Sequence, residues 1–214
     1  YTIPSQRVEV KLPVVLDFKF AQFLGYLIGD GCLEQDRVSF FEQRKELALH
    51  YKQMFDEYFG LQSSYRFRES KNYHQLRFTS RPLVRLIKSE FPEITTALTC
   101  SIPQKVLCSS NIVLAGFLQG LFDAEGYVSS SNRVGIGMNN KKLIQQVQMA
   151  LFRFSIISSF RSYDNAKNPY SDNIRYSLEI SEKKSLALFQ ELIGFNSEEK
   201  KSLLTNIIAN KSKR

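Results

Sequence analysis

Cysteine and histidine are scarce in this sequence, and their scarcity limits the sites that it can build. Among 214 residues there are three cysteines and two histidines. The number of cysteines is odd and the spacing of Cys32, Cys100 and Cys108 fits no zinc pattern, so we expect reduced thiols in a reducing compartment. His50 and His74 are too few for a metal site built on histidine.

The sequence also lacks a hydrophobic run of membrane-spanning length. The longest apolar stretch, residues 18–29, contains Lys19 and Gln22, whereas a spanning helix needs about 20 apolar residues. The sequence has no recognisable signal peptide and does not begin with methionine. We therefore expect an intracellular protein with no membrane partner. Its many Phe, Ile, Asn, Lys and Ser residues favour an AT-rich genome, either in an organelle (mitochondrion or chloroplast) or in a prokaryote with the protein in its cytoplasm.

Positive charge is in excess. Basic residues outnumber acidic ones 29 to 21, which gives a formal net charge of +8. This surplus favours a polyanionic partner, either nucleic acid or an acidic surface. The hydrophobic content of 43% and the charged content of 23% are otherwise those of an ordinary globular protein.

Two short segments match each other at a constant offset along the chain. Residues 21–31 read AQFLGYLIGDG and residues 116–126 read GFLQGLFDAEG. Each is a helical run with small residues four positions apart, which lie on one face of a helix. Glycine inside a helix costs about 1 kcal/mol relative to alanine, so close packing of the two helices must compensate. The small residues predicted at this interface are Ala21, Gly25, Gly29, Gly116, Gly120 and Ala124.

One acid follows the last small residue of each segment. Asp30 and Glu125 would both stand at the C-terminal end of a helix, where the helix dipole opposes a carboxylate. If the helices pack as a twofold pair, the two carboxylates also repel each other. A divalent cation such as Mg²⁺, which prefers carboxylate oxygens, waters and phosphates, would resolve both conflicts. The pattern therefore predicts one active site made by both acids.

The predicted elements repeat in the order α-β-β-α-β-β-α. The fold class is α+β, with two pseudo-symmetric halves, the matched helices packed at the central interface, and two antiparallel sheets. We expect an N-terminal half, a linker, a C-terminal half, and a final helix with a basic tail, over residues 1–92, 93–110, 111–195 and 196–214. The chain start is predicted to be extended, and a polar loop is expected around Pro169.

The segments FLGYLIGDG (23–31) and LQGLFDAEG (118–126) resemble the LAGLIDADG motif of homing endonucleases, and the two-motif chain is similar to the monomeric members of that family. The resemblance implies a saddle whose sheets lie along the major groove of a long DNA site. It also implies that Asp30 and Glu125, beside Gly29 and Ala124, bind Mg²⁺ and cut one strand each, leaving short 3′ overhangs. Mn²⁺ should substitute, and Ca²⁺ should bind without cleavage.

Auxiliary catalytic residues follow from the same resemblance. Gln43, at the end of a strand, resembles the usual polar position, and Asn139 occupies a similar place in the second half. A lysine often found shortly after the second motif is absent, since residues 127–129 read YVS. Lys141 is a candidate for this basic group.

Alternation along the predicted strands places many basic and amide side chains on one face of each sheet. Arginine and glutamine can read base edges in the major groove. Each residue alone is equally consistent with an ordinary solvent-facing position, but together they favour a DNA surface. The residues predicted to bind DNA are Arg37, Arg44, Arg66, Arg68, Gln75, Arg77, Arg133, Lys141, Arg161 and Arg175.

Three functions are compatible with these residues. The first is a site-specific double-strand DNA endonuclease, the second an RNA maturase that binds its host intron, and the third a DNA-binding regulator that does not cut. The presence of both acids favours the first. An intein origin is disfavoured, because there is no N-terminal Cys or Ser nucleophile and no C-terminal His-Asn pair.

Overall fold

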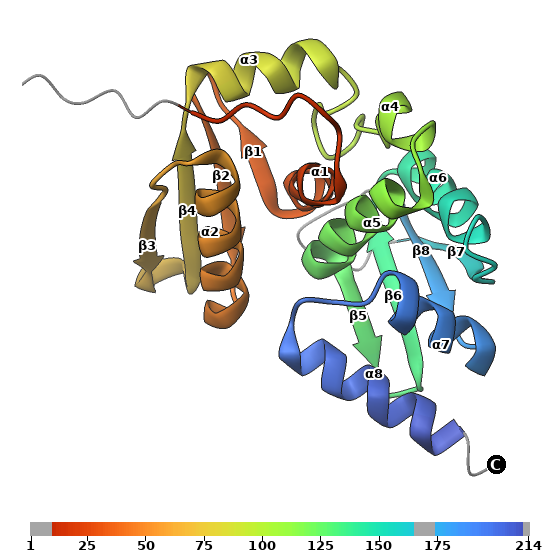
Figure 1. Cartoon of the computed structure of the whole chain (residues 1–214). Helices are drawn as coiled ribbons and strands as arrows, with labels where there is room; N and C mark the ends of the chain where they lie inside the picture. The colour runs from red at the N-terminus through yellow and green to blue at the C-terminus, as the bar shows by residue number, and fades with distance from the viewer. Residues whose placement is uncertain (1–9, 165–173, 212–214) are drawn as a thin grey trace, which may run out of the picture.

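The computed structural model describes residues 10–164 and 174–211. These residues form two halves of like element order, which meet at a pair of central helices (Figure 1). The predicted loop around Pro169, most of the extended chain start and the end of the basic tail lie outside the described residues. Within the described ranges, no helix has the length and hydropathy needed to cross a membrane.

The first half follows the predicted order. Asp17 caps its first helix, because its Oδ1 accepts a hydrogen bond from Phe20 N at 2.8 Å. Gly60 ends the second helix with φ 61°, in the left-handed region that suits glycine. The elements are α1 (Phe18–Asp30), β1 (Gly31–Leu33), β2 (Arg37–Glu42), α2 (Lys45–Phe59), β3 (Ser64–Arg68), β4 (Tyr73–Thr79) and α3 (Arg81–Glu90).

The second half repeats that order and adds one helix at its end. The linker before it contains a short helix, α4 (Gln104–Leu107), that the sequence did not predict. The later elements are α5 (Asn111–Glu125), β5 (Gly126–Ser129), β6 (Arg133–Met138), α6 (Lys141–Phe152), β7 (Ser159–Tyr163), β8 (Arg175–Ile180), α7 (Lys183–Leu192) and α8 (Glu198–Lys211). The predicted α+β fold with two αββαββα halves is confirmed.

Each half holds one four-stranded antiparallel sheet. The strand orders are β1-β2-β4-β3 and β5-β6-β8-β7, so the two sheets have the same topology. Alternate residues of the strands are buried against the helices of the same half, as period-two patterning requires. The buried positions of the inner strands include Val38, Phe40, Leu76, Phe78, Val134, Ile136, Leu178 and Ile180.

The helices α1 and α5 pack together at the centre and join the two cores into one. Their backbones come so close that a Cβ added to Gly25 or Gly120 would overlap a carbonyl oxygen of the opposite helix. Gln22 Nε2 donates to Gln119 Oε1 across the pair at 2.5 Å. The interface therefore tolerates helical glycine because the partner backbone fills the space.

Candidate active site at the ends of the central helices

Asp30 and Glu125 are the last residues of α1 and α5, and both are half-buried. The two helix ends adjoin, since a Cβ added to Gly29 would lie 3.3 Å from Glu125 Cγ and would overlap Ala124 Cβ. The packing of the central helices therefore brings one acid from each half to the same end of the interface.

The environment of these acids favours their neutral forms. Burial, followed by the nearby charges of Glu42 and Glu125, raises the pKa of Asp30 from 3.8 to about 7. Burial also raises the pKa of Glu125, against the lowering effect of Arg175 and Lys200. Two half-buried carboxyl groups at adjoining helix ends are poor for stability, and positive charge between them would favour their charged forms.

A cavity of about 440 Å³ lies beside Asp30. Gln43, which was predicted to be catalytic, is exposed at the end of β2 and lines this cavity. Both halves contribute to the wall, because α5, β5 and α8 face α1, β2 and α2 there. The lining residues are Asp30, Phe41, Glu42, Gln43, Arg44, Ala124, Gly126, Glu199 and Lys200.

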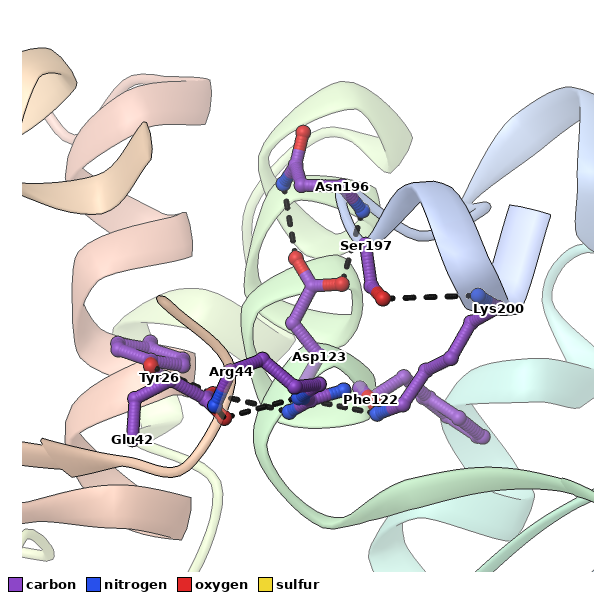
Figure 2. A network of polar contacts seen from close by, with 8 residues as sticks. All are labelled: Tyr26, Glu42, Arg44, Phe122, Asp123, Asn196, Ser197 and Lys200. Atoms are coloured by element: carbon purple, nitrogen blue, oxygen red, sulfur yellow. Dashed lines mark hydrogen bonds and ion pairs between the residues drawn. The ribbon is translucent and has the colours of Figure 1, made fainter. Parts of the chain in front are cut away.

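Arg44 ties the first half to the end of α5. Its Nε and Nη2 donate to the two carboxylate oxygens of Glu42 at 2.8 and 2.9 Å, and Nη2 also donates to the Asp123 carbonyl oxygen at 2.8 Å. Tyr26 Oη donates to the same carboxylate at 3.0 Å. The structure thus gives Arg44, which was predicted to bind DNA, an internal ion pair (Figure 2). Arg44 also lines the cavity beside Asp30.

Lys200 reaches the same place from α8. Its Nζ donates to the carbonyl oxygens of Asp123 and Phe122 at 2.7 and 3.1 Å. Figure 2 shows Arg44 and Lys200 approaching the end of α5 from opposite sides. Two cations therefore complement the negative end of the α5 dipole. Burial and the neighbouring Arg44 lower the pKa of Lys200 to about 8.

Lys200 was not predicted from the sequence, because it lies in α8, 75 residues after the last acid of the second motif. Asp123 was missed as well. Its buried carboxylate accepts hydrogen bonds from Tyr51 Oη at 2.5 Å and from the backbone N and Nδ2 of Asn196, each at 2.8 Å. Asp123 thereby joins α5 to α2 and to the turn before α8. These contacts position the start of α8, the helix that carries Lys200. In the sequence, the one sign of this network was an acid at position 123 within an otherwise apolar helical segment.

The second half differs at the matched positions. Asn140 is the residue before α6, as Arg44 is the residue before α2. Its Oδ1 accepts from Leu143 N at 3.0 Å and its Nδ2 donates to the Cys100 carbonyl oxygen at 2.7 Å. Asn139 is half-buried just after β6, and Lys141 is exposed at the start of α6. Neither residue is among those that line the cavity beside Asp30.

The first sheet carries its arginines on the face opposite the helices. Arg66 is exposed, and Arg37 is paired with Asp36 at 2.9 Å. Gln75 was predicted to point outward, but it is only 6% exposed, and its side-chain amide lies within hydrogen-bond distance of both Arg68 and Arg77. Long side chains on this face therefore cover shorter ones.

The second sheet carries three of the predicted arginines. Arg133 and Arg161 both contact Glu179, and Arg175 Nη2 donates to the Gly137 carbonyl oxygen at 2.7 Å. These arginines are thus held by partners on their own sheet.

The donor set at the helix ends fits a hard divalent cation. Over residues 10–164 and 174–211, no group of three or more His, Cys, Asp or Glu side chains could enclose a metal ion. Two carboxylates remain, Asp30 and Glu125. Mg²⁺ is commonly bound by one or two carboxylates together with waters and substrate phosphates, so the residues present fit such a site.

A family model matches both halves of the chain. The model of the LAGLIDADG-like domain matches residues 17–90 and again residues 113–194. Each match includes the terminal acid of one central helix and all or most of that helix. The chain belongs to the LAGLIDADG-like domain family, with two motifs in one chain.

Curated relatives of this LAGLIDADG chain include two proteins of Methanocaldococcus jannaschii. Its glutamine–fructose-6-phosphate aminotransferase is 32% identical over 202 residues, which cover 93% of this chain and 18% of that protein. Its probable translation initiation factor IF-2 is 30% identical over 213 residues, which cover 93% of this chain and 17% of that protein. The chain therefore spans less than a fifth of the length of these relatives.

Solved structures share the two-half LAGLIDADG fold. A mesophilic variant of the homing endonuclease I-DmoI is similar with a TM-score of 0.61 and 19% identity, covering 83% of this chain and 96% of that one. I-DmoI in complex with DNA and Mn gives a TM-score of 0.59, 19% identity, and coverage of 86% and 99%. Full-length DUF199/WhiA from Thermatoga maritima gives 0.62, 14% identity, and coverage of 94% and 63%.

Proposed function

We propose that this chain is a site-specific, divalent-metal-dependent endonuclease that acts as a monomer on double-stranded DNA. One observation carries the proposal: Asp30 and Glu125, one from each half, end two close-packed helices side by side. Each half also supplies one sheet with arginines on its open face. This arrangement suits a long, nearly non-palindromic site in which each acid serves one strand and cleavage leaves short 3′ overhangs.

Asp30 and Glu125 are the residues that would hold Mg²⁺, next to the backbone at Gly29 and Ala124. When bound, the cation supplies positive charge that offsets the charge developing on the reacting phosphate. Burial raises the pKa of both acids despite the nearby cations, and a bound divalent cation would favour their charged forms. Mn²⁺ should replace Mg²⁺, and Ca²⁺ should support binding without cutting.

Lys200 and Arg44 provide the positive charge that the chain itself places beside Asp30. An ammonium group has three N–H donors, and Lys200 directs two of them to the last turn of α5. We assign the third to a phosphate oxygen of the DNA. The guanidinium of Arg44 adds a second charge in the same wall, and Gln43 stands exposed at its edge.

The relatives favour an inserted domain. An aminotransferase and an initiation factor have different activities. The segment that both share with this chain is therefore not the source of either activity. We infer that it is an independent domain carried within larger proteins, as in an intein. The expectation against an intein rested on the ends of this sequence, which carry no conclusion about a longer protein. The full gene tests this inference: a Cys or Ser before the domain and a His-Asn pair after it would support it, and a free-standing intron reading frame would contradict it.

Cleavage selection from a randomised DNA library tests the proposed activity. With Mg²⁺, the protein should linearise a small set of related sequences with short 3′ overhangs, and Ca²⁺ should yield complexes without breaks. Tight DNA binding without cleavage in Mg²⁺ or Mn²⁺ would instead assign a non-cutting regulator. Preferential binding of intron RNA over duplex DNA would assign a maturase.

A further inference from the structure

The open face of the second sheet carries a carboxylate between two arginines. Glu179 in β8 contacts Arg133 Nη1 in β6 at 2.6 Å and Arg161 Nη2 in β7 at 3.3 Å. The side chain of Glu179 is 17% exposed, against 32% for Arg133 and 56% for Arg161. The acid is thus the covered centre of a three-strand cluster, which we call the Arg–Glu–Arg clamp.

The strand register explains how both arginines reach one acid. Glu179 lies opposite Gly135 on β6 and opposite Ser159 on β7. Neither neighbour has a long side chain of its own, and the ring of Tyr127 from β5 occupies the space above Gly135. Arg133 lies two residues before Gly135 and Arg161 lies two residues after Ser159, and both guanidinium groups reach diagonally to the carboxylate of Glu179.

The first sheet holds the same frame with the opposite charge at its centre. Ser39 pairs with Arg77, and Arg77 pairs with Ser64, in the register positions of Gly135, Glu179 and Ser159. Arg37 and Arg66 correspond in the same way to Arg133 and Arg161. The central position of this frame therefore holds arginine (Arg77) in the first half and glutamate (Glu179) in the second. The two flanking arginines are present in both halves.

We propose that Glu179 is a specificity-determining residue of the second sheet, an inference that rests on the proposed DNA binding. The clamp keeps two guanidinium groups away from phosphates, whose recognition carries no sequence information. It also holds them in place before binding, which lowers the entropy cost of docking. Their remaining N–H donors can meet acceptors on base edges, and the acid penalises a wrongly placed phosphate or base acceptor.

In this arrangement the two sheets contribute differently to DNA binding. The first sheet, with Arg77 at its centre, supplies charge for general attraction to the duplex. The second sheet supplies discrimination, because two of its arginine charges are tied to an internal acid. The sites for these tasks are on different sheets, so they can be separated by substitution.

The test compares Glu179→Gln with wild type in binding to random-sequence duplex DNA over a range of salt, with Ca²⁺ present to prevent cutting. Glutamine keeps the size of the side chain and removes its charge. Release of the two arginines should tighten non-specific binding and should steepen the plot of log K against log salt by about 1 to 2. Glu191→Gln, on the exposed end of α7, is the matched control and should change neither quantity.

A second arm measures sequence preference by selection from a DNA library. Glu179→Gln should relax preference at the base pairs under the second half and leave those under the first half unchanged. Arg77→Glu should act in the opposite sense and make the salt plot shallower. A merely structural role predicts lower thermal stability of Glu179→Gln with an unchanged salt slope and preference, and that result would overturn the inference. If the wild type binds no duplex at any salt, the proposed function itself fails.

Discussion

Arg44 stands before α2, and Asn140 stands at the matching position before α6. Arg44 forms an ion pair with Glu42 and reaches the end of α5, whereas Asn140 caps its own helix and holds the linker. The residues that precede the equivalent helices α2 and α6 thus have different roles. The backbone plan repeats between the halves, but the polar groups around the two acids do not.

The difference follows from what each feature must satisfy. The helical glycines cannot change without a clash, because a carbonyl oxygen or, at Gly29, the Ala124 side chain of the partner helix occupies the space. A polar side chain at a helix start meets no such limit, provided that its hydrogen bonds are satisfied. Pseudo-symmetry therefore predicts the positions of the acids, but it does not predict the cations beside them.

The largest effect should come from the acids, which the halves share. Asp30→Asn and Glu125→Gln should each reduce double-strand cutting on the order of a thousandfold or more, since loss of a metal ligand removes several kcal/mol of transition-state stabilisation. Binding measured in Ca²⁺ should change little. Glu191→Gln serves as the control and should cut like the wild type. Wild-type cutting by Asp30→Asn would show that the active site is elsewhere.

The next effect should come from the cations, which the halves do not share. Lys200→Met should slow cleavage about a hundredfold, the usual cost of losing one preorganised donor, with DNA binding in Ca²⁺ retained. Asn140→Ala, the comparison at the matched helix start, should cost about 1 kcal/mol of stability as a lost helix cap and leave the cleavage rate near wild type. Equal cleavage rates for Lys200→Met and the wild type would remove Lys200 from the site.

Packing of the central helices gives a smaller effect. Gly120→Ala would place a methyl group against the Gln22 carbonyl oxygen. We expect a loss of about 1–3 kcal/mol in the free energy of unfolding, as for overpacked cores, measured by urea denaturation. In an isolated helix the same change would stabilise by up to about 1 kcal/mol. Stabilisation of the protein would therefore mean that α1 and α5 are not in close contact at this position.

The smallest effect concerns pH. Because the pKa of Asp30 is raised from 3.8 to about 7, the folded state binds a proton that the unfolded state has lost between these values. The contribution of Asp30 to stability is thus complete below about pH 4 and is lost as the pH rises towards 7. Asp30→Asn should flatten this part of the curve of melting temperature against pH. Added Mg²⁺ should stabilise the wild type more at about pH 8 than at about pH 5, since metal binding needs the deprotonated acid. An unchanged curve in Asp30→Asn would contradict the assignment.

Much of the fold could be predicted from the sequence, because it rests on local signals. The repeated small residues marked the central helices, and strand alternation placed most arginines on one face of each sheet. The acids of the site were visible for the same reason, as Asp30 and Glu125 end matched segments.

The remainder depends on contacts between distant segments. Lys200 is brought beside Asp30 by α8, and Asp123 meets Tyr51 and Asn196 from two other elements. No periodicity or spacing marks such contacts. Alternation also gives the side of a strand but not what covers it, which is why Gln75 was expected at the surface and is buried beside Arg68 and Arg77.

The assignment of one acid to each strand can be measured directly. Each strand of the selected target is end-labelled separately and is incubated in Mg²⁺ with the wild type, Asp30→Asn or Glu125→Gln, and the products are resolved on denaturing gels. The account predicts that the two variants leave opposite strands uncut while the wild type cuts both. Cutting of both strands at the wild-type rate by either variant would contradict the account.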